Sequence, residues 1–326
     1  MMTQATVRRR TALSLCRTGR LVALATLAWL LPAALAPASA DMIYGKGVLW
    51  KVETDGATTS HLFGTMHSDD ERVLDLPDAA DAAFAAADTV ALEVLIAEPQ
   101  AAAELGMKLA PQLIMTDGRT LDQMIGPERM ETVAEALARS GMPAAAARLL
   151  KPWVAYMLLN VPAPRAGPDG KPLAKLDIQI ERDARALGKQ VEALETIDEQ
   201  VALFQGFDEE KEILLLTELI DAARQRGDVA QYMNALFALV VDLYEDGEIG
   251  MILEVTQPPM PEDEVAAVDM ILDRLLYQRN LIMVERMERF LANGNAFIAI
   301  GAAHLPGERG VLNLLAEKGY NITLVH

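Results

Sequence analysis

Residues Ser60–His67 read SHLFGTMH, a short apolar run that ends in a glycine and, three positions later, a histidine. The pattern returns near the other end of the chain, where Ala296–His304 read AFIAIGAAH. Apolar runs of this length indicate buried strands, and open α/β sheets bind ligands beyond the carboxyl ends of such strands. We therefore expect Gly64 and Gly301 to let the backbone turn, so that His67 and His304 lie at a sheet edge.

The surrounding sequence predicts an α/β fold. Val48–Glu53 and Ser60–Thr65 flank the turn sequence TDGA, which is typical of a β-hairpin. Pro77–Asp88 is alanine-rich and predicts a helix, and Thr89–Leu95 predicts a strand. Because strand signals cluster at both ends of the chain, we expect a central sheet built from both ends, with an α+β arrangement as the alternative.

Helical periodicity dominates the middle of the chain. It extends over about 98–160 and about 198–275, interrupted by glycine and proline. We expect residues 41–326 to form a single domain in which these two segments are helical insertions that cover the sheet.

The first forty residues are typical of a secretory signal peptide. Arg8–Arg10 begin a basic segment, Leu21–Leu31 form an apolar core, and Ala38–Ala40 resemble a cleavage site. A retained membrane anchor fits less well, because Pro32 and Pro37 interrupt an apolar run that is already short for a span of about 20 residues. We predict export to the periplasm, by the general or the twin-arginine route, and no membrane span after cleavage.

The charge and cysteine content exclude several classes of protein. The chain carries 47 acidic and 29 basic residues, a net charge of −18, and the predicted leader contains none of the acids. Such a surface repels nucleic acid and anionic lipid. The one cysteine, Cys16, lies in the leader, so the mature chain can form no disulfide. We expect no nucleic-acid partner.

Two imidazoles and one carboxylate form the candidate site. Glu93 interrupts the apolar run VALEVL, where a buried carboxylate is costly unless it is paired, protonated or bound to a metal. His67, His304 and Glu93 would suit a divalent ion, with zinc, manganese, iron and cobalt all compatible. Glu93 would be a ligand or the general base. The alternatives are that both histidines are structural and that Glu93 faces solvent.

Other charged residues could join this site. Asp69, Asp70 and Glu71 follow His67 directly, and they would be either further ligands or a helix cap. Arg279 could bind a substrate carboxylate or stabilise an oxyanion, or it could simply pair with an acid.

Several segments in order along the chain resemble the TraB/PrgY/GumN family, which is related to the Tiki proteases. At the amino end these are LWKV at 49–52, HLFGTMH at 61–67 and Leu92-Glu93; farther on they are Asp177, ALET at 193–196, Glu199-Gln200, Arg279-Asn280, IGAAHLPG at 300–307 and Gly319-Tyr320.

The resemblance implies a fold similar to the erythromycin esterase and ChaN-like group, with two related halves that each carry a strand and a GxxH turn. It also implies a metal-dependent peptidase supported by manganese or cobalt. By position, it assigns metal ligation to His67 and His304, a ligand or base role to Glu93, and a substrate or transition-state role to Arg279. The matching residues Asp177, Glu195 and Gln200 we interpret first as structural hydrogen-bonding groups.

Our leading hypothesis is a secreted metal-dependent hydrolase that cleaves a peptide or protein substrate with a metal-bound water. The alternative is a non-catalytic periplasmic protein of the GumN type that binds a metal complex or a polysaccharide. A helical scaffold without activity would instead keep the two histidines far apart. The sequence identifies neither the metal nor the substrate nor the oligomeric state.

Overall fold

A computed structural model describes residues 42–160, 165, 173–206, 208–225, 227, 229–256, 269–270 and 272–326. Asp41–His326 forms one compact unit, separate from Met1–Ala40. The predicted signal peptide and part of the predicted helical insertion at 198–275 lie outside the described residues. Within those residues, no helix is long and apolar enough to cross a bilayer.

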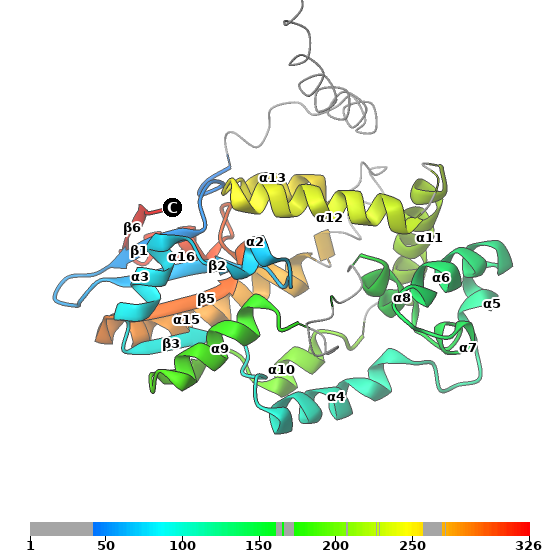
Figure 1. Cartoon of the computed structure of the whole chain (residues 1–326), viewed down its shortest axis with the longest axis horizontal. Helices are drawn as coiled ribbons and strands as arrows, with labels where there is room; N and C mark the ends of the chain where they lie inside the picture. Colours follow the sequence, from blue (N-terminus) through cyan, green and yellow to red (C-terminus); the bar gives the residue numbers. More distant parts are fainter. Residues whose placement is uncertain are drawn as a thin grey trace, which may run out of the picture. The chain divides into compact units, whose positions relative to one another are not determined.

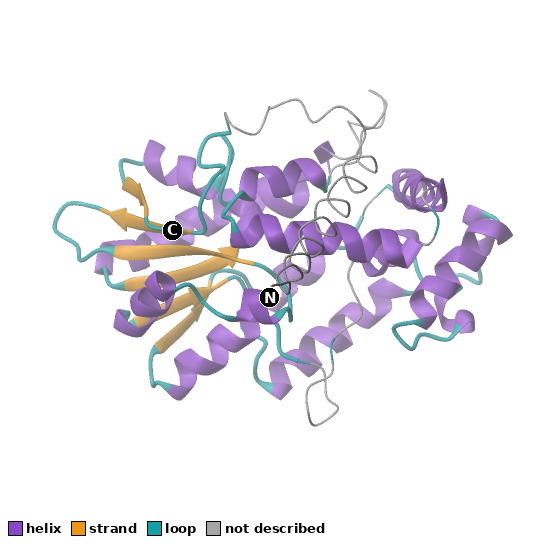
Figure 2. Cartoon of the chain, turned by 45° about the horizontal axis from the view of Figure 1, so that its top comes forward, coloured by secondary structure: helices purple, strands orange, loops and turns teal. Residues whose placement is uncertain are grey.

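The centre of the fold is a six-stranded mixed sheet, seen in orange in Figure 2. Its strand order is β4-β3-β5-β2-β1-β6. Neighbouring strands β4, β3, β5 and β2 are parallel, whereas β1 is antiparallel to both β2 and β6. The strands are β1 Leu49–Glu53, β2 Ser60–Thr65, β3 Thr89–Leu92, β4 Gln190–Ala193, β5 Ala296–Gly301 and β6 Asn321–Leu324.

The sheet confirms the predicted α/β fold and the use of both chain ends. β1 and β2 form the predicted hairpin, with Trp50 opposite Leu62. β2 from the front of the chain and β5 from the back are neighbours, with Thr65 opposite Gly301. The two glycine-histidine motifs therefore lie side by side.

Helices from both ends of the chain pack on this sheet (Figure 1). α9 contacts β3 and β4, α15 contacts β5, and α16 contacts β6. The helices of this layer are α2 Glu71–Leu74, α3 Asp78–Ala86, α9 Leu176–Ala186, α15 Gln278–Asn293 and α16 Val311–Glu317.

The middle of the chain supplies the remaining helices; in Figure 1, α12 and α13 lie above the sheet, α5–α8 and α11 to its right, and α4 and α10 below and to its right. The first group is α4 Pro99–Leu113, α5 Leu121–Ile125, α6 Pro127–Ala138, α7 Ala144–Ala147 and α8 Pro152–Leu159. The second is α10 Ile197–Ala202, α11 Glu209–Gln225, α12 Val229–Glu245, α13 Ile249–Val255 and the π-helix η2 Asp273–Tyr277, which leads into α15.

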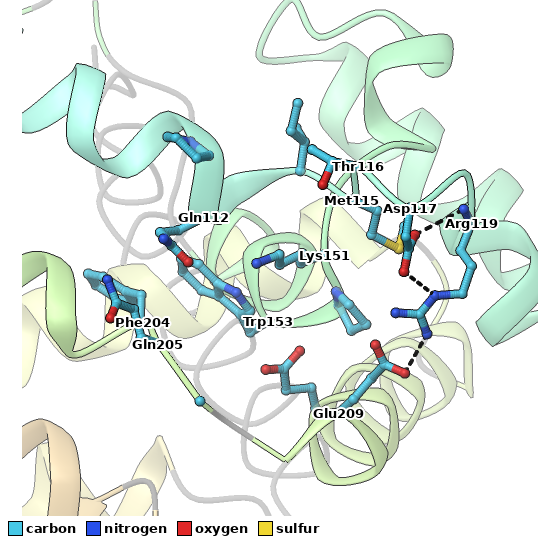
Figure 3. Close-up of a pocket in the computed structure, with 15 residues that line it drawn as sticks. Gln112, Met115, Thr116, Asp117, Arg119, Lys151, Trp153, Phe204, Gln205 and Glu209 are labelled. Carbon is cyan, nitrogen blue, oxygen red and sulfur yellow. Dashed lines mark hydrogen bonds and ion pairs between the residues drawn. The ribbon is translucent and has the colours of Figure 1, made fainter.

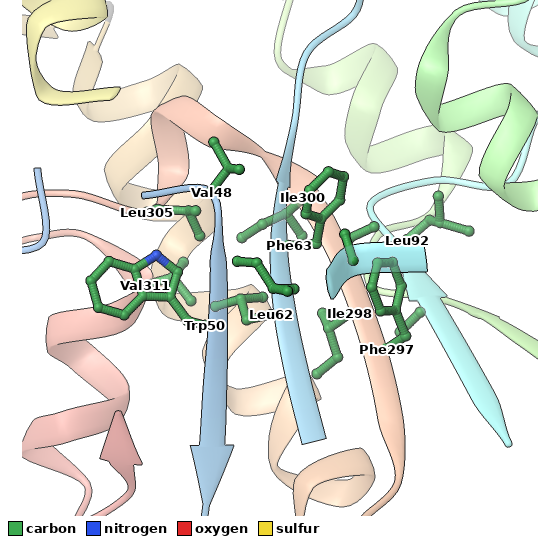
Figure 4. Packing of buried hydrophobic residues seen from close by; sticks show 14 of the residues in the cluster. Val48, Trp50, Leu62, Phe63, Leu92, Phe297, Ile298, Ile300, Leu305 and Val311 are labelled. Carbon is green, nitrogen blue, oxygen red and sulfur yellow. The ribbon is translucent and has the colours of Figure 1, made fainter. Parts of the chain in front are cut away.

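Two apolar clusters hold the unit together. The larger one fills both faces of the sheet, and its central strand β5 is buried along nearly its whole length, as expected for a strand covered by helices on both sides. The rings of Phe297 and Phe63 (Figure 4) have centroids 5.7 Å apart, and those of Phe297 and Phe84 have centroids 5.6 Å apart. The second cluster lies among α5, α6, α8 and α11. The strand ends that carry the candidate site are thus fixed to a rigid core.

A charged cluster at the carboxyl edge of the sheet

The carboxyl ends of the parallel strands bring four titratable side chains to one edge of the sheet. Glu195, Glu93, His304 and His67 follow β4, β3, β5 and β2, in that order across the sheet. Parallel strands end at the same edge, which is where open α/β sheets bind their ligands. The structure therefore gathers the predicted site residues from both halves of the chain.

Glu93 is buried and points inward, so the alternative that it faces solvent is wrong. Its Oε1 accepts a 2.6 Å hydrogen bond from the Gly301 amide, and its Oε2 accepts a 2.5 Å bond from Nη2 of Arg279. Burial acts to raise the pKa of Glu93, but His304, Arg279 and His67 together lower it to about 2. Arg279 thus supplies the positive charge that compensates the buried Glu93 carboxylate. The sequence had suggested that a metal ion could do this.

Arg279 uses all five of its N–H donors within the protein. Nε and Nη2 donate to the two oxygens of Glu195 at 2.9 and 2.6 Å, and Nη2 also donates to Glu93. Nη1 donates to the Leu275 carbonyl at 2.8 Å and lies 3.1 Å from Nε2 of His304. A guanidinium has five N–H groups, so none remains for a substrate in this arrangement. The geometry supports the structural alternative for Arg279, that of pairing with acids.

His304 is buried and its tautomer is fixed by Asn280. The Asn280 amide nitrogen donates to the Arg309 carbonyl at 2.8 Å, which turns its Oδ1 toward Nδ1 of His304 at 2.6 Å. Nδ1 must then carry the proton, and Nε2 keeps a lone pair. Burial lowers the pKa of His304 to about 4, so the ring is neutral at neutral pH. Of the groups around Glu93, Arg279 is therefore the one with a permanent charge.

His67 has the same tautomer but a different environment. Its Nδ1 donates to Oδ2 of Asp177 at 2.5 Å, and Oδ1 of Asp177 accepts a bond from the Thr65 hydroxyl. The His67 side chain is 63% exposed. The Asp177 carboxylate raises the pKa of His67, and the His67 ring is close enough to act electrostatically on Glu93 and His304. Nε2 of His67 is left for a ligand.

Both motif glycines lie in close contact with neighbouring groups, and neither has a positive φ. Gly301 has a φ of −53°, which any residue adopts. A Cβ at Gly301 would lie 3.2 Å from Oε1 of Glu93, and one at Gly64 would lie 2.7 Å from the Leu305 side chain. The glycines therefore let the neighbouring segments and the Glu93 carboxylate approach the strands.

The acidic run after His67 begins a helix. The Asp70 side chain accepts a bond from the Arg72 amide and caps α2, and Glu71 lies in the first turn of that helix. Asp69 accepts a 2.7 Å bond from the Arg165 amide. These contacts agree with the interpretation of the run as a helix cap. They do not bring Asp69, Asp70 or Glu71 next to Glu93.

Two positioning groups had no role in the sequence interpretation. Asn280, which orients His304, stands next to Arg279 in the chain, and this adjacency was the available signal. Tyr244 on α12 donates a 2.7 Å hydrogen bond to the Gly64 carbonyl and so ties the helical region to the first motif. No pattern in the sequence connects residues 180 positions apart in this way.

The donor types at this edge suit a divalent ion. Both imidazoles commit Nδ1–H to an oxygen acceptor, and in its neutral form each ring has a lone pair on Nε2, the usual arrangement of metal-binding histidines. Among the described residues, however, no three His, Cys, Asp or Glu side chains are grouped so as to hold an ion. In this structure, Arg279 and the Gly301 amide donate hydrogen bonds to the two oxygens of Glu93, and Arg279 also contacts Nε2 of His304. By chemistry, His67 and His304 are the residues that would hold the ion, with Glu93 as the third donor.

Replacing Asp177 with Asn should weaken metal binding about 10- to 100-fold, the range found when such outer partners are removed. The Thr65 hydroxyl would hold the amide oxygen, so the amide NH2 would face Nδ1 of His67 and force the proton onto Nε2. Calorimetric titration with Mn2+, Co2+ and Zn2+ measures the change, with Asp183→Asn on the exposed side of α9 as control. Equal affinity in both variants would exclude a ligand role for His67.

Three curated relatives are metalloproteases by name. "Metalloprotease TIKI2" of Danio rerio is 25% identical over 81% of this chain and 58% of its own length. "Metalloprotease TIKI1" of Homo sapiens is 24% identical over 84% and 61%. The "Metalloprotease TIKI homolog" of Amphimedon queenslandica is 25% identical over 54% and 37%.

This chain thus spans less than two thirds of the length of these relatives, and no solved structure matches it significantly. The family model that matches covers residues 48–324, from the first strand to the last, and includes both glycine-histidine motifs and the Glu93 and Arg279 positions. The protein belongs to the TraB/PrgY/gumN family.

Proposed function

We propose that this protein is a metal-dependent hydrolase that cleaves peptide bonds. The observation that carries the proposal is the placement of His67, His304 and Glu93 after neighbouring strands at the carboxyl edge of one parallel sheet. The names of its relatives, which are metalloproteases, support the same reaction class. The leader sequence supports a further proposal, that the protein acts after export to the periplasm.

The two histidines would hold the ion through their Nε2 atoms. A bound divalent ion lowers the pKa of a water molecule and polarises a carbonyl group, which is the chemistry needed for hydrolysis. Manganese and cobalt are the ions we favour, and zinc and iron suit the same donors. Asp177 and Asn280 accept hydrogen bonds from Nδ1 of the two rings, which favours the tautomer with a lone pair on Nε2; at His304 the ion would replace the contact with Arg279.

Glu93 is better suited to be a ligand than a general base. A general base works best with a pKa near the operating pH, and the pKa of Glu93 is about 2. Arg279 fixes the Glu93 carboxylate against Glu195, so we assign it a positioning role. Substrate would approach from the side of His67, which is the exposed imidazole of the pair.

The test uses the whole chain from Asp41, purified in a chelator and then supplied with Mn2+, Co2+ or Zn2+. We expect cleavage in a broad peptide library that appears with metal and disappears with chelator. We expect a His67→Ala, His304→Ala double variant that keeps its circular dichroism spectrum to lose the bound ion. An intact protein that binds metal and cleaves no peptide would instead be a binding protein of the non-catalytic class.

A further inference from the structure

A second site lies among the helices of the middle region, apart from the charged cluster. Here a cavity of about 530 Å3 opens between α4 and the loop after it, the start of α8, the segment after α10 and the start of α11 (Figure 3). This volume is within the range of ligand pockets in proteins, about 300–1,000 Å3. Its walls combine aromatic, amide and charged side chains, which Figure 3 shows around the cavity.

An aromatic pair forms part of the wall. Trp153 of α8 and Phe204, just after α10, stack with ring centroids 4.7 Å apart and an interplanar angle of 11°. Gln205 and Gly206 continue the wall from Phe204. Aromatic surface of this kind packs against the aliphatic stem of a long side chain and attracts a cation at its end.

The charges around the cavity leave one carboxylate without a cation. Arg119 is shared between Asp117 and Glu209, each at 2.6 Å. Glu212 is half-buried, and burial raises its pKa, while the Trp153 amide and the charge of Lys151 oppose this effect. Among the described residues, neither Glu212 nor Lys151 forms an ion pair. With three acids and two bases in the lining, the pocket has a net negative charge, and Glu212 is a half-buried carboxylate that forms no ion pair among the described residues.

The pocket is connected to the charged cluster by α10. Gln200 on this helix donates a 2.7 Å bond to Glu195, the acid that holds Arg279, and Phe204 follows the end of the same helix. A helix of this length spans about 9 Å. An extended peptide advances about 3.3 Å per residue, so about three to five residues would bridge the pocket and the cluster.

We propose that this pocket is a substrate subsite that receives the lysine or arginine side chain of a peptide, about three to five residues from the bond to be cleaved. The aliphatic stem packs on Trp153 and Phe204, and the cationic end pairs with Glu212. The net negative charge of the chain also favours a basic substrate, because it raises the local concentration of a positively charged peptide. This inference rests on the proposed peptidase function.

The experiment measures binding separately from cleavage. Fluorescently labelled peptides that differ at one position, with lysine, arginine, norleucine or glutamate, are titrated into the chelator-treated chain by anisotropy. Norleucine has the length of the lysine stem without its charge. We expect the lysine and arginine peptides to bind at least tenfold more tightly than the norleucine and glutamate peptides.

The matched variants are Glu212→Gln, which removes only the charge, and Glu210→Gln, which removes an exposed carboxylate from the same helix outside the pocket. The tenfold preference should disappear in the first and persist in the second. Equal affinity for all peptides, a preference for glutamate, or a preference unchanged in Glu212→Gln would overturn the subsite.

With metal restored, the same peptides test the link to catalysis. We expect cleavage about three to five residues from the basic residue, and a kcat/KM at least tenfold lower for the norleucine peptide. Cleavage that ignores the basic residue would overturn the subsite while leaving the peptidase intact. Binding that depends on Glu212 without any cleavage would instead overturn the peptidase.

Discussion

An Arg279→Met variant should lose about 3–5 kcal/mol of unfolding free energy, the cost of removing one partner from a buried ion pair. Arg279 compensates two carboxylates, and the side chains of Glu93 and Glu195 are only 10% and 3% exposed. Without the guanidinium, two negative charges would face each other out of water. Since a domain is typically stable by 5–15 kcal/mol, the variant should be close to its unfolding threshold at room temperature.

Urea denaturation at pH 7, followed by circular dichroism, measures this loss. The control is Arg286→Met on the same helix, because Arg286 pairs with Glu199 where both side chains are more than one third exposed. An exposed pair contributes at most about 1 kcal/mol. A loss from Arg279→Met no larger than the loss from Arg286→Met would show that the cluster is solvated.

A rescue variant separates charge from packing. Adding Glu93→Gln and Glu195→Gln to Arg279→Met removes both unpaired charges while keeping the size of each side chain. Most of the lost stability should return, because the penalty comes from uncompensated charge. If the triple variant were as unstable as the single one, the loss would come from the packing of the Arg279 stem instead.

The sheet and the convergence of the two motifs could be predicted from the sequence because their signals are local. Apolar runs before Gly64 and Gly301 indicate strands, and parallel strands place their carboxyl ends together. The burial of Glu93 was one of two interpretations of the sequence, because a carboxylate in an apolar run either has a partner or faces solvent. The identity of that partner was beyond local patterns, since Arg279 lies 186 positions away in the sequence.

The reason for the motif glycines was also beyond the sequence alone. A glycine before a loop usually indicates a turn, whereas here it makes room for Leu305 at one motif and for the Glu93 carboxylate at the other. The same limit applies to the helical pocket, because its lining comes from three helices and the loops beside them, which are separated along the chain. Such contacts depend on how the helices pack, and periodicity identifies the helices without specifying their neighbours.

Acidification should destabilise the metal-free protein through His304. The pKa of His304 is about 4 in the fold and about 6.5 in the unfolded chain, because burial disfavours the charged ring. The unfolded chain therefore binds one more proton between these values, and stability that is complete above pH 6.5 is lost as the pH falls toward 4. A difference of one bound proton changes the free energy of unfolding by about 1.4 kcal/mol per pH unit, or by about 2 kcal/mol between pH 6.5 and 5.

Comparison with His304→Gln isolates this contribution. Glutamine does not titrate and its amide can still donate to Asn280, whereas His67 titrates in both proteins and acts in the opposite sense, because Asp177 raises its pKa. Urea denaturation in chelator at pH 7 and pH 5 should show the stability advantage of the native chain over the variant shrinking by about 2 kcal/mol. An advantage independent of pH would mean that the fold leaves the pKa of His304 at its unfolded value, and an advantage that grew at pH 5 would mean that the ring is charged in the fold, where it has no lone pair for a metal.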